Sequence, residues 1–226
     1  MKKPFFVVNP KSYLYGEKLE KLAKKSDEVS EKYNVKIYFT APFVELKKIN
    51  EISKNIILTA QHMDDTIVGR GMGHIVGEML VDSGVRAVIL NHAEHKIDNK
   101  KLESTILRAK ELKLDTIVCA STYDEIEYIS KLHPFAILCE PTELIGTSIT
   151  SGNDYIDKSS EIIRRIDSNI YVMQAAGVTT PEDTYNIIQR GADATGCTSG
   201  IVLAENPEEM IEKMVVSLIK GYQERR

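Results

Sequence analysis

The chain has 226 residues, 42% of them hydrophobic and 27% charged, and carries a net charge of −4. These values predict one soluble domain over residues 1–226, and the absence of a basic stripe or a bilayer-length apolar run excludes nucleic-acid-binding and membrane-spanning proteins. The three cysteines are widely spaced and odd in number, which argues against a disulfide framework or a metal site and favours a cytoplasmic location.

Short apolar or β-branched runs alternate with charged amphipathic segments along the whole chain. The runs predict strands over residues 5–9, 36–40, 56–61, 86–91, 115–120, 135–140, 170–174 and 192–197. The amphipathic segments predict helices over residues 17–33, 44–52, 75–83, 99–112, 123–131, 154–167, 181–190 and 207–222. Eight strand–helix units predict a single closed (β/α)8 barrel. An open doubly wound sheet is the second choice, because no glycine-rich dinucleotide motif follows the first strand.

Glu140 is the most informative residue of the sequence. It ends the apolar run of the sixth strand and is followed directly by Pro141 and a loop that contains glycine and threonine. Catalytic groups of (β/α)8 barrels lie at the C-terminal ends of the strands. A carboxylate at the end of a buried strand, beside a loop that can cover it, is typical of a general base.

Two further strand ends carry groups that complement such a base. Lys11 follows the first strand and supplies the fixed positive charge that an enediolate or a phosphate requires. His92 follows the fourth strand just before a helical segment, which favours a neutral imidazole. Small residues after the last two strands let backbone N–H groups approach a phosphate. The combination predicts proton transfer between adjacent carbons of a small phosphorylated sugar, without a metal or other cofactor.

Three motifs resemble those of the triosephosphate isomerases, and the short form found in archaea fits best. They are Asn9-x-Lys11, Asn91-His92-x-Glu94 and Glu140-Pro141-x-Glu143-Leu144-Ile145-Gly146-Thr147. The resemblance covers essentially the whole chain. It implies a glycolytic and gluconeogenic isomerase that interconverts glyceraldehyde 3-phosphate and dihydroxyacetone phosphate. Lys11 would then be the electrostatic catalyst, His92 the electrophile and Glu140 the base.

The same resemblance implies further binding groups and a partner. Asn9 would hold Lys11 or the substrate, and Glu94 would lie behind Lys11 as a buried partner. Residues 142–150 would form a lid over the site. Residues 69–73 would reach a neighbouring subunit of a homodimer or homotetramer. The residues implied to surround the phosphate are Ile145, Gly146, Gly177, Thr198 and Ser199.

Several positions depart from the pattern of that family, chiefly Met72, Ala93, Ser148 and Ala175. Pro10, between Asn9 and Lys11, is a further departure. If Ala175 had to adopt a positive φ, it would cost about 1–2 kcal/mol relative to glycine. These departures leave two alternatives open: an isomerase of a related sugar phosphate, such as a tetrulose phosphate, and a barrel that binds a phosphorylated ligand without catalysis.

Overall fold

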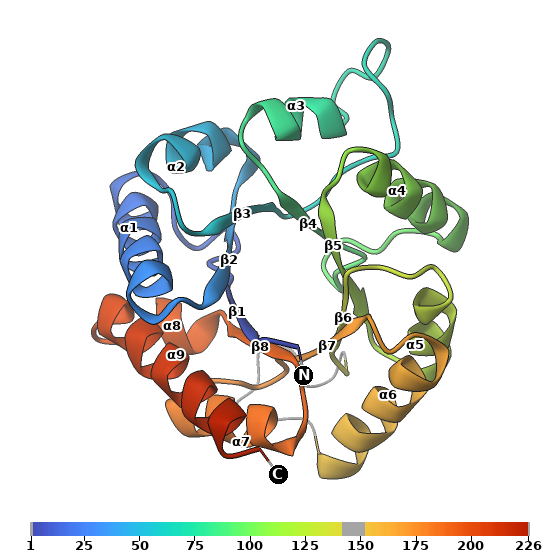
Figure 1. The fold of residues 1–226 in the computed structure, drawn as a ribbon. Helices are drawn as coiled ribbons and strands as arrows, with labels where there is room; N and C mark the ends of the chain where they lie inside the picture. Colours follow the sequence, from blue (N-terminus) through green and yellow to red (C-terminus); the bar gives the residue numbers. More distant parts are fainter. Residues whose placement is uncertain (1, 142–151, 226) are drawn as a thin grey trace.

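The computed structural model describes residues 2–141 and 152–225. Within these residues, parallel strands close into a barrel in the order β1 to β8, and Figure 1 shows helices surrounding this ring. The strands are β1 (Phe5–Val8), β2 (Lys36–Ala41), β3 (Ile57–Ala60), β4 (Ala87–Leu90), β5 (Asp115–Ala120), β6 (Ala136–Cys139), β7 (Tyr171–Gln174) and β8 (Ala194–Cys197). The predicted (β/α)8 barrel is therefore confirmed.

The helices follow the predicted order with three local differences. They are α1 (Gly16–Tyr33), α2 (Leu46–Ile52), α3 (Gly77–Asp82), α4 (Asn99–Glu111), α5 (Tyr123–Ser130), α6 (Asn153–Ile166), α7 (Pro181–Arg190), α8 (Ser199–Val202) and α9 (Pro207–Gln223). The predicted 44–52 helix opens with the 3-10 turn η1 (Phe43–Glu45). α3 starts late because Ile75 is tied to Asp64 by two hydrogen bonds, one in each direction. The four-residue α8 was not predicted.

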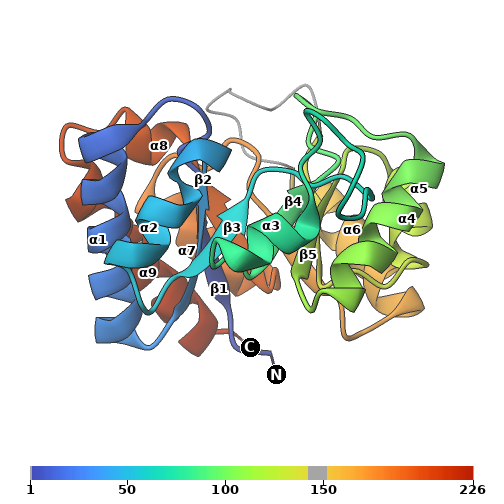
Figure 2. The same ribbon diagram turned by 90° about the horizontal axis from the view of Figure 1, so that it is seen from above.

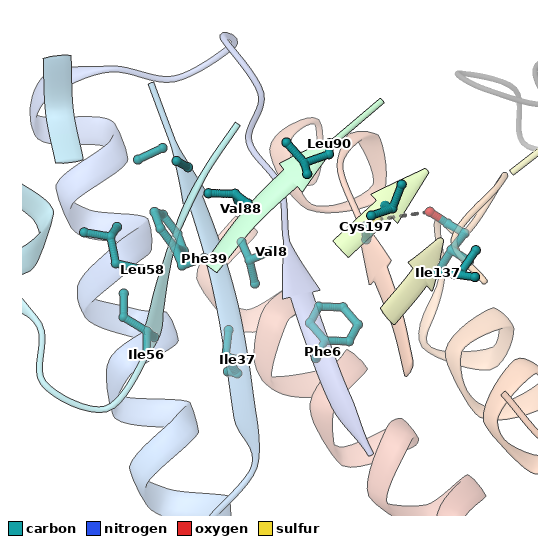
Figure 3. Packing of buried hydrophobic residues seen from close by; sticks show 14 of the residues in the cluster. Phe6, Val8, Ile37, Phe39, Ile56, Leu58, Val88, Leu90, Ile137 and Cys197 are labelled. Carbon is teal, nitrogen blue, oxygen red and sulfur yellow. Dashed lines mark hydrogen bonds between the residues drawn. The ribbon is translucent and has the colours of Figure 1, made fainter. Parts of the chain in front are cut away.

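Buried side chains form an inner and an outer layer, since successive strand residues point to opposite faces. In β1, Phe5 and Val7 belong to the cluster inside the barrel, whereas Phe6 and Val8 belong to the cluster between barrel and helices. Figure 3 shows part of the outer layer, including Phe6, Val8 and neighbouring side chains from β2 to β4. At the N-terminal end of the strands, the aromatic rings of Phe5, Tyr38, Phe135 and Tyr171 pack together. The barrel is therefore a filled core and not a pore.

The first and last strands of the barrel pair with each other. Phe5 lies opposite Ala194 and Val8 opposite Cys197, and the Asn9 N–H extends this pairing by donating to the Cys197 carbonyl at 3.2 Å. Figure 2 shows the loops that follow the strands gathered at one end of the barrel, opposite the start of β1. The loops after β1 and β8 are thus held side by side at that end.

Membrane-spanning helices and metal-binding clusters are not found in residues 2–141 and 152–225. No helix there combines the length and the apolar character that crossing a bilayer requires. No group of three or more His, Cys, Asp or Glu side chains in the same residues is placed to hold a metal ion. Cys119, Cys139 and Cys197 are all buried and free.

Candidate active site

A cavity of about 90 Å³ lies at the C-terminal ends of the strands. Its apolar floor includes Ile89, Leu138 and Met173 from the inside of the barrel. Seven predicted site residues line it together: Asn9, Lys11, His92, Glu140, Gly177, Thr198 and Ser199. Glu94 lines an adjoining cavity that shares Asn9, Lys11 and His92. Ile145, Gly146 and the predicted lid over residues 142–150, with Ser148, lie outside the described residues.

The backbone of Lys11 has a φ of 47°, a left-handed conformation that costs a non-glycine residue about 1–2 kcal/mol. Two hydrogen bonds hold it there. The Lys11 N–H donates to Asn9 Oδ1 at 3.1 Å, and Gln61 Nε2 donates to the Lys11 carbonyl at 2.8 Å. The buried Thr40 hydroxyl donates to the same Asn9 Oδ1 at 2.7 Å. Because the Asn9 amide oxygen is thus occupied, its NH2 group is the end that can face a ligand.

Sequence reasoning missed the roles of Thr40 and Gln61. Both lie at the C-terminal ends of their strands, which is the only signal that the sequence offers. Pro10 fits the loop without conflict, because its carbonyl accepts the Tyr13 N–H at 3.0 Å in a tight turn. A proline has no N–H to satisfy, and none is needed at this point of the turn.

The ammonium group of Lys11 is held by an ion pair. Its Nζ lies 2.6 Å from Glu94 Oε1, and the hydrogen bond from Lys11 lowers the pKa of Glu94. The Glu94 side chain is 63% exposed, so the prediction that it is a buried partner is wrong. Because water surrounds this carboxylate, the pair contributes little to stability. It sets the direction of the Lys11 side chain, which is only 20% exposed.

The imidazole of His92 is held in one tautomer. Its Nδ1 accepts the backbone N–H of Glu94 at 3.1 Å, so in the neutral ring the proton lies on Nε2. Burial is the main reason why the pKa of His92 is lowered, and the positive charge of Lys11 lowers it further. His92 is therefore a neutral hydrogen-bond donor at neutral pH, which was predicted from its place before a helix. Desolvation accounts for this state in the structure.

Glu140 follows β6 directly, and its N–H continues the strand ladder by donating to the Ala120 carbonyl at 2.9 Å. Burial raises the pKa of Glu140 to about 7, partly opposed by the nearby charge of Lys11. A carboxyl group with a pKa near the working pH can both take and return a proton. The strand fixes the backbone of this group, and burial beside the apolar floor of the cavity desolvates its carboxyl group.

The loops after β7 and β8 pack backbone against backbone. A Cβ added at Gly200 would lie 2.4 Å from the Thr179 carbonyl oxygen, so only glycine allows this approach. Gly177 has a φ of 68°, which favours glycine for a different reason. Ala175 is not left-handed, so the strain considered for that position does not arise. Ser199 is the first residue of α8 and lines the cavity together with Thr198.

The chain matches known proteins over nearly all of its length. The family model described as triosephosphate isomerase matches residues 4–214. Triosephosphate isomerase from Sulfolobus acidocaldarius is 34% identical over 230 residues, which cover 100% of this chain and 99% of that protein. The protein of the same name from Sulfurisphaera tokodaii is 34% identical over 100% of this chain and 100% of its own length. That from Methanocaldococcus jannaschii is 32% identical over 92% of this chain and 97% of its own length. The chain belongs to the triosephosphate isomerase family.

Proposed function

We propose that this protein interconverts glyceraldehyde 3-phosphate and dihydroxyacetone phosphate, with Glu140 as the base, His92 as the electrophile and Lys11 as the electrostatic catalyst. Family membership makes the chain an isomerase. The observation that supports these roles best is the convergence of the three side chains, from three distant strand ends, on one small cavity. The protonation states agree with these roles. Glu140, with a pKa of about 7, can take up and release a proton, and His92, whose pKa is lowered, is neutral.

The reaction needs one proton to move between adjacent carbons. The Glu140 carboxylate removes a proton from C1 of dihydroxyacetone phosphate, and the electron pair of that C–H bond forms the double bond of an enediolate. The Nε2–H of His92 donates to O2, where negative charge develops, and Lys11 stabilises the same charge. The Nε2–H of His92 gives its proton to O2, and Nε2 takes up the proton of O1 in its place. Glu140 returns its proton to C2, which leaves an aldehyde at C1 and a hydroxyl at C2. Every group in this scheme lines the cavity.

Substrate binding is proposed for the rest of the cavity wall. The free NH2 group of Asn9 faces the substrate, and Gly177, Thr198 and Ser199 surround its phosphate. Ile145 and Gly146 complete the phosphate site in this proposal, although their part of the chain lies outside the described residues. The close packing of Gly200 on Thr179 supports this phosphate site, because the packing brings together the loops that follow β7 and β8.

Turnover of a series of C3 to C5 sugar phosphates tests the proposed substrate. We expect the triose phosphates to have the highest kcat/KM, because the chain belongs to the triosephosphate isomerase family. A higher kcat/KM with a tetrulose phosphate would contradict the proposal and favour the related isomerase. Binding of a phosphorylated ligand without any turnover would instead identify a barrel that only binds its ligand.

We further propose that the protein works as a cytoplasmic homo-oligomer, dimeric or tetrameric. The loop between β3 and α3 projects beyond the body of the barrel in Figure 1. Its apolar side chains Ile67, Val68 and Met72 are 64%, 60% and 102% exposed, which is typical of a surface that another chain covers. The free state of the three cysteines supports the cytoplasmic location.

Met72→Glu should shift the protein towards smaller species in sedimentation velocity, because the change places a charge in an apolar contact between subunits. Leu203→Glu is the matched control, since Leu203 is 76% exposed in a different region, directly after α8. Equal sedimentation of wild type and Met72→Glu would remove this loop from the interface.

A further inference from the structure

Asn91 stands between β4 and His92 in a conformation that few residues accept. Its φ is 59°, and the residue is 4% exposed. Asparagine and glycine tolerate the left-handed region better than other residues do. A left-handed residue at the end of a strand turns the chain sharply, so this conformation sets the direction in which His92 leaves the barrel.

Both ends of the Asn91 side-chain amide are used in hydrogen bonds. Nδ2 donates to the carbonyl of Cys119 at 2.9 Å, which ties the residue to β5. Oδ1 accepts the N–H of Ile97 at 3.1 Å, which closes the loop of residues 92–96. The amide thus connects the neighbouring strand with the far end of the loop that carries His92.

The loop closed by Asn91 contains the contacts that orient the imidazole. The N–H of His95 donates to the His92 carbonyl at 2.8 Å, and the N–H of Glu94 donates to His92 Nδ1 at 3.1 Å. Beyond Ile97, Asp98 caps α4 by accepting the Lys101 N–H at 3.1 Å, so the loop is fixed at its far end too. The bond that selects the imidazole tautomer therefore depends on a loop whose two ends Asn91 holds together.

We propose that Asn91 is a positioning residue for the isomerase reaction: its amide holds the loop of residues 92–96 so that the Nε2–H of His92 points into the cavity. This role rests on the proposed function of His92 as the electrophile. Asn91 does not touch the substrate in this account. It acts by keeping the Glu94 N–H within reach of His92 Nδ1, and so keeps the donor in place before the substrate arrives.

Asn91→Gly tests the role cleanly, because glycine keeps the left-handed backbone and removes both side-chain hydrogen bonds. We expect kcat for the triose phosphates to fall by about 10–10²-fold with KM changed little, since small misplacements of a catalytic group have effects of this size. The matched control is Asn34→Gly. Asn34 is also left-handed, with a φ of 51°, but it is exposed between α1 and β2, at the end of the barrel opposite the cavity, so kcat should stay at the wild-type value.

The imidazole ¹⁵N shifts of His92 separate positioning from simple stabilisation. In wild type they should show one tautomer, with Nδ1 unprotonated, and in Asn91→Gly a mixture of the two tautomers. Unchanged kcat, or unchanged ¹⁵N shifts together with a lower melting temperature, would overturn the proposal.

Asn91→Asp is the second variant should Asn91→Gly fold poorly. Its ionised carboxylate keeps the acceptor for the Ile97 N–H but faces the Cys119 carbonyl oxygen at a buried position, so we expect kcat below the wild-type value. A wild-type kcat in a well-folded Asn91→Asp would overturn the role of the donor. His92→Gln is measured in parallel. If His92→Gln is as active as wild type, the proposed role of His92 fails, whereas the ¹⁵N shifts of Asn91→Gly still decide whether Asn91 orients the ring.

Discussion

Glu140→Gln should lower kcat for the triose phosphates by about 10²–10⁴-fold or more, the usual contribution of a positioned acid–base group. Glutamine keeps the size of the side chain and its place after β6 but cannot accept a proton from carbon. Coupled-enzyme turnover measures the effect. Glu127→Gln, on the surface of α5, is the matched control and should leave kcat unchanged. Equal rates for wild type and Glu140→Gln would remove Glu140 from the mechanism.

The pH profile of the same reaction should reflect the raised pKa of Glu140. The carboxylate is the active form of a base, so kcat/KM should rise with pH up to about 7 and level off above it. An ordinary exposed glutamate would give this rise near pH 4.5. A profile that is flat between pH 5 and 8 would contradict the assignment of Glu140 as the base.

The same burial has a consequence for stability. Because the pKa of Glu140 is raised in the folded protein, the folded state binds a proton more tightly than the unfolded chain does, and stability is lost as pH rises from about 4.5 to about 7. The loss amounts to roughly 3 kcal/mol above pH 7. The Glu140→Gln protein should therefore have a higher free energy of unfolding than wild type at pH 8, although its kcat is lower, and urea denaturation measures this difference.

Lys11→Met should lower kcat/KM by about 10²–10³-fold, the effect of losing one oriented group that stabilises charge in the transition state. Methionine has a similar length but no charge, so the developing enediolate loses its nearest cation. The exposed Glu94 is left without its partner, but water solvates it, and the melting temperature should change little.

Lys21→Met provides the control for the loss of one positive charge. Lys21 is 76% exposed on α1 and pairs with Glu208, so kcat/KM should match that of wild type. If Lys11→Met retains the wild-type kcat/KM, then the charge of Lys11 has no part in the reaction. If its melting temperature falls strongly as well, the residue has a structural role that the exposed ion pair does not predict.

Much of the fold could be predicted because the alternation of apolar runs and amphipathic segments is local information. β6 and Glu140 illustrate this: an apolar run ends in one carboxylate, and the barrel rule assigns the strand end to the active site. α3 and α8 illustrate the limit. The hydrogen bonds between Asp64 and Ile75 delay the start of α3, and four residues of α8 are too few to show a helical period.

The identities of Lys11, His92 and Glu140 could be predicted as candidates, whereas their supporting contacts could not. Thr40 holds Asn9 from the neighbouring strand β2, and Gln61 holds Lys11 from the end of β3, one strand further round the barrel. Such contacts depend on strand register, which a single sequence does not specify. The exposure of Glu94 was missed for a similar reason, since it depends on how the loop after β4 turns.

The pairing of β1 with β8 has a consequence for how the protein is made. One neighbour of β1, the strand β2, leaves the ribosome soon after it, but the other neighbour, β8, leaves only after β2 to β7 have been synthesised. Until then β1 has an unpaired edge, which is a site for aggregation and a target for chaperones. Nascent chains should therefore be inactive, and activity should appear only after the final strand has docked.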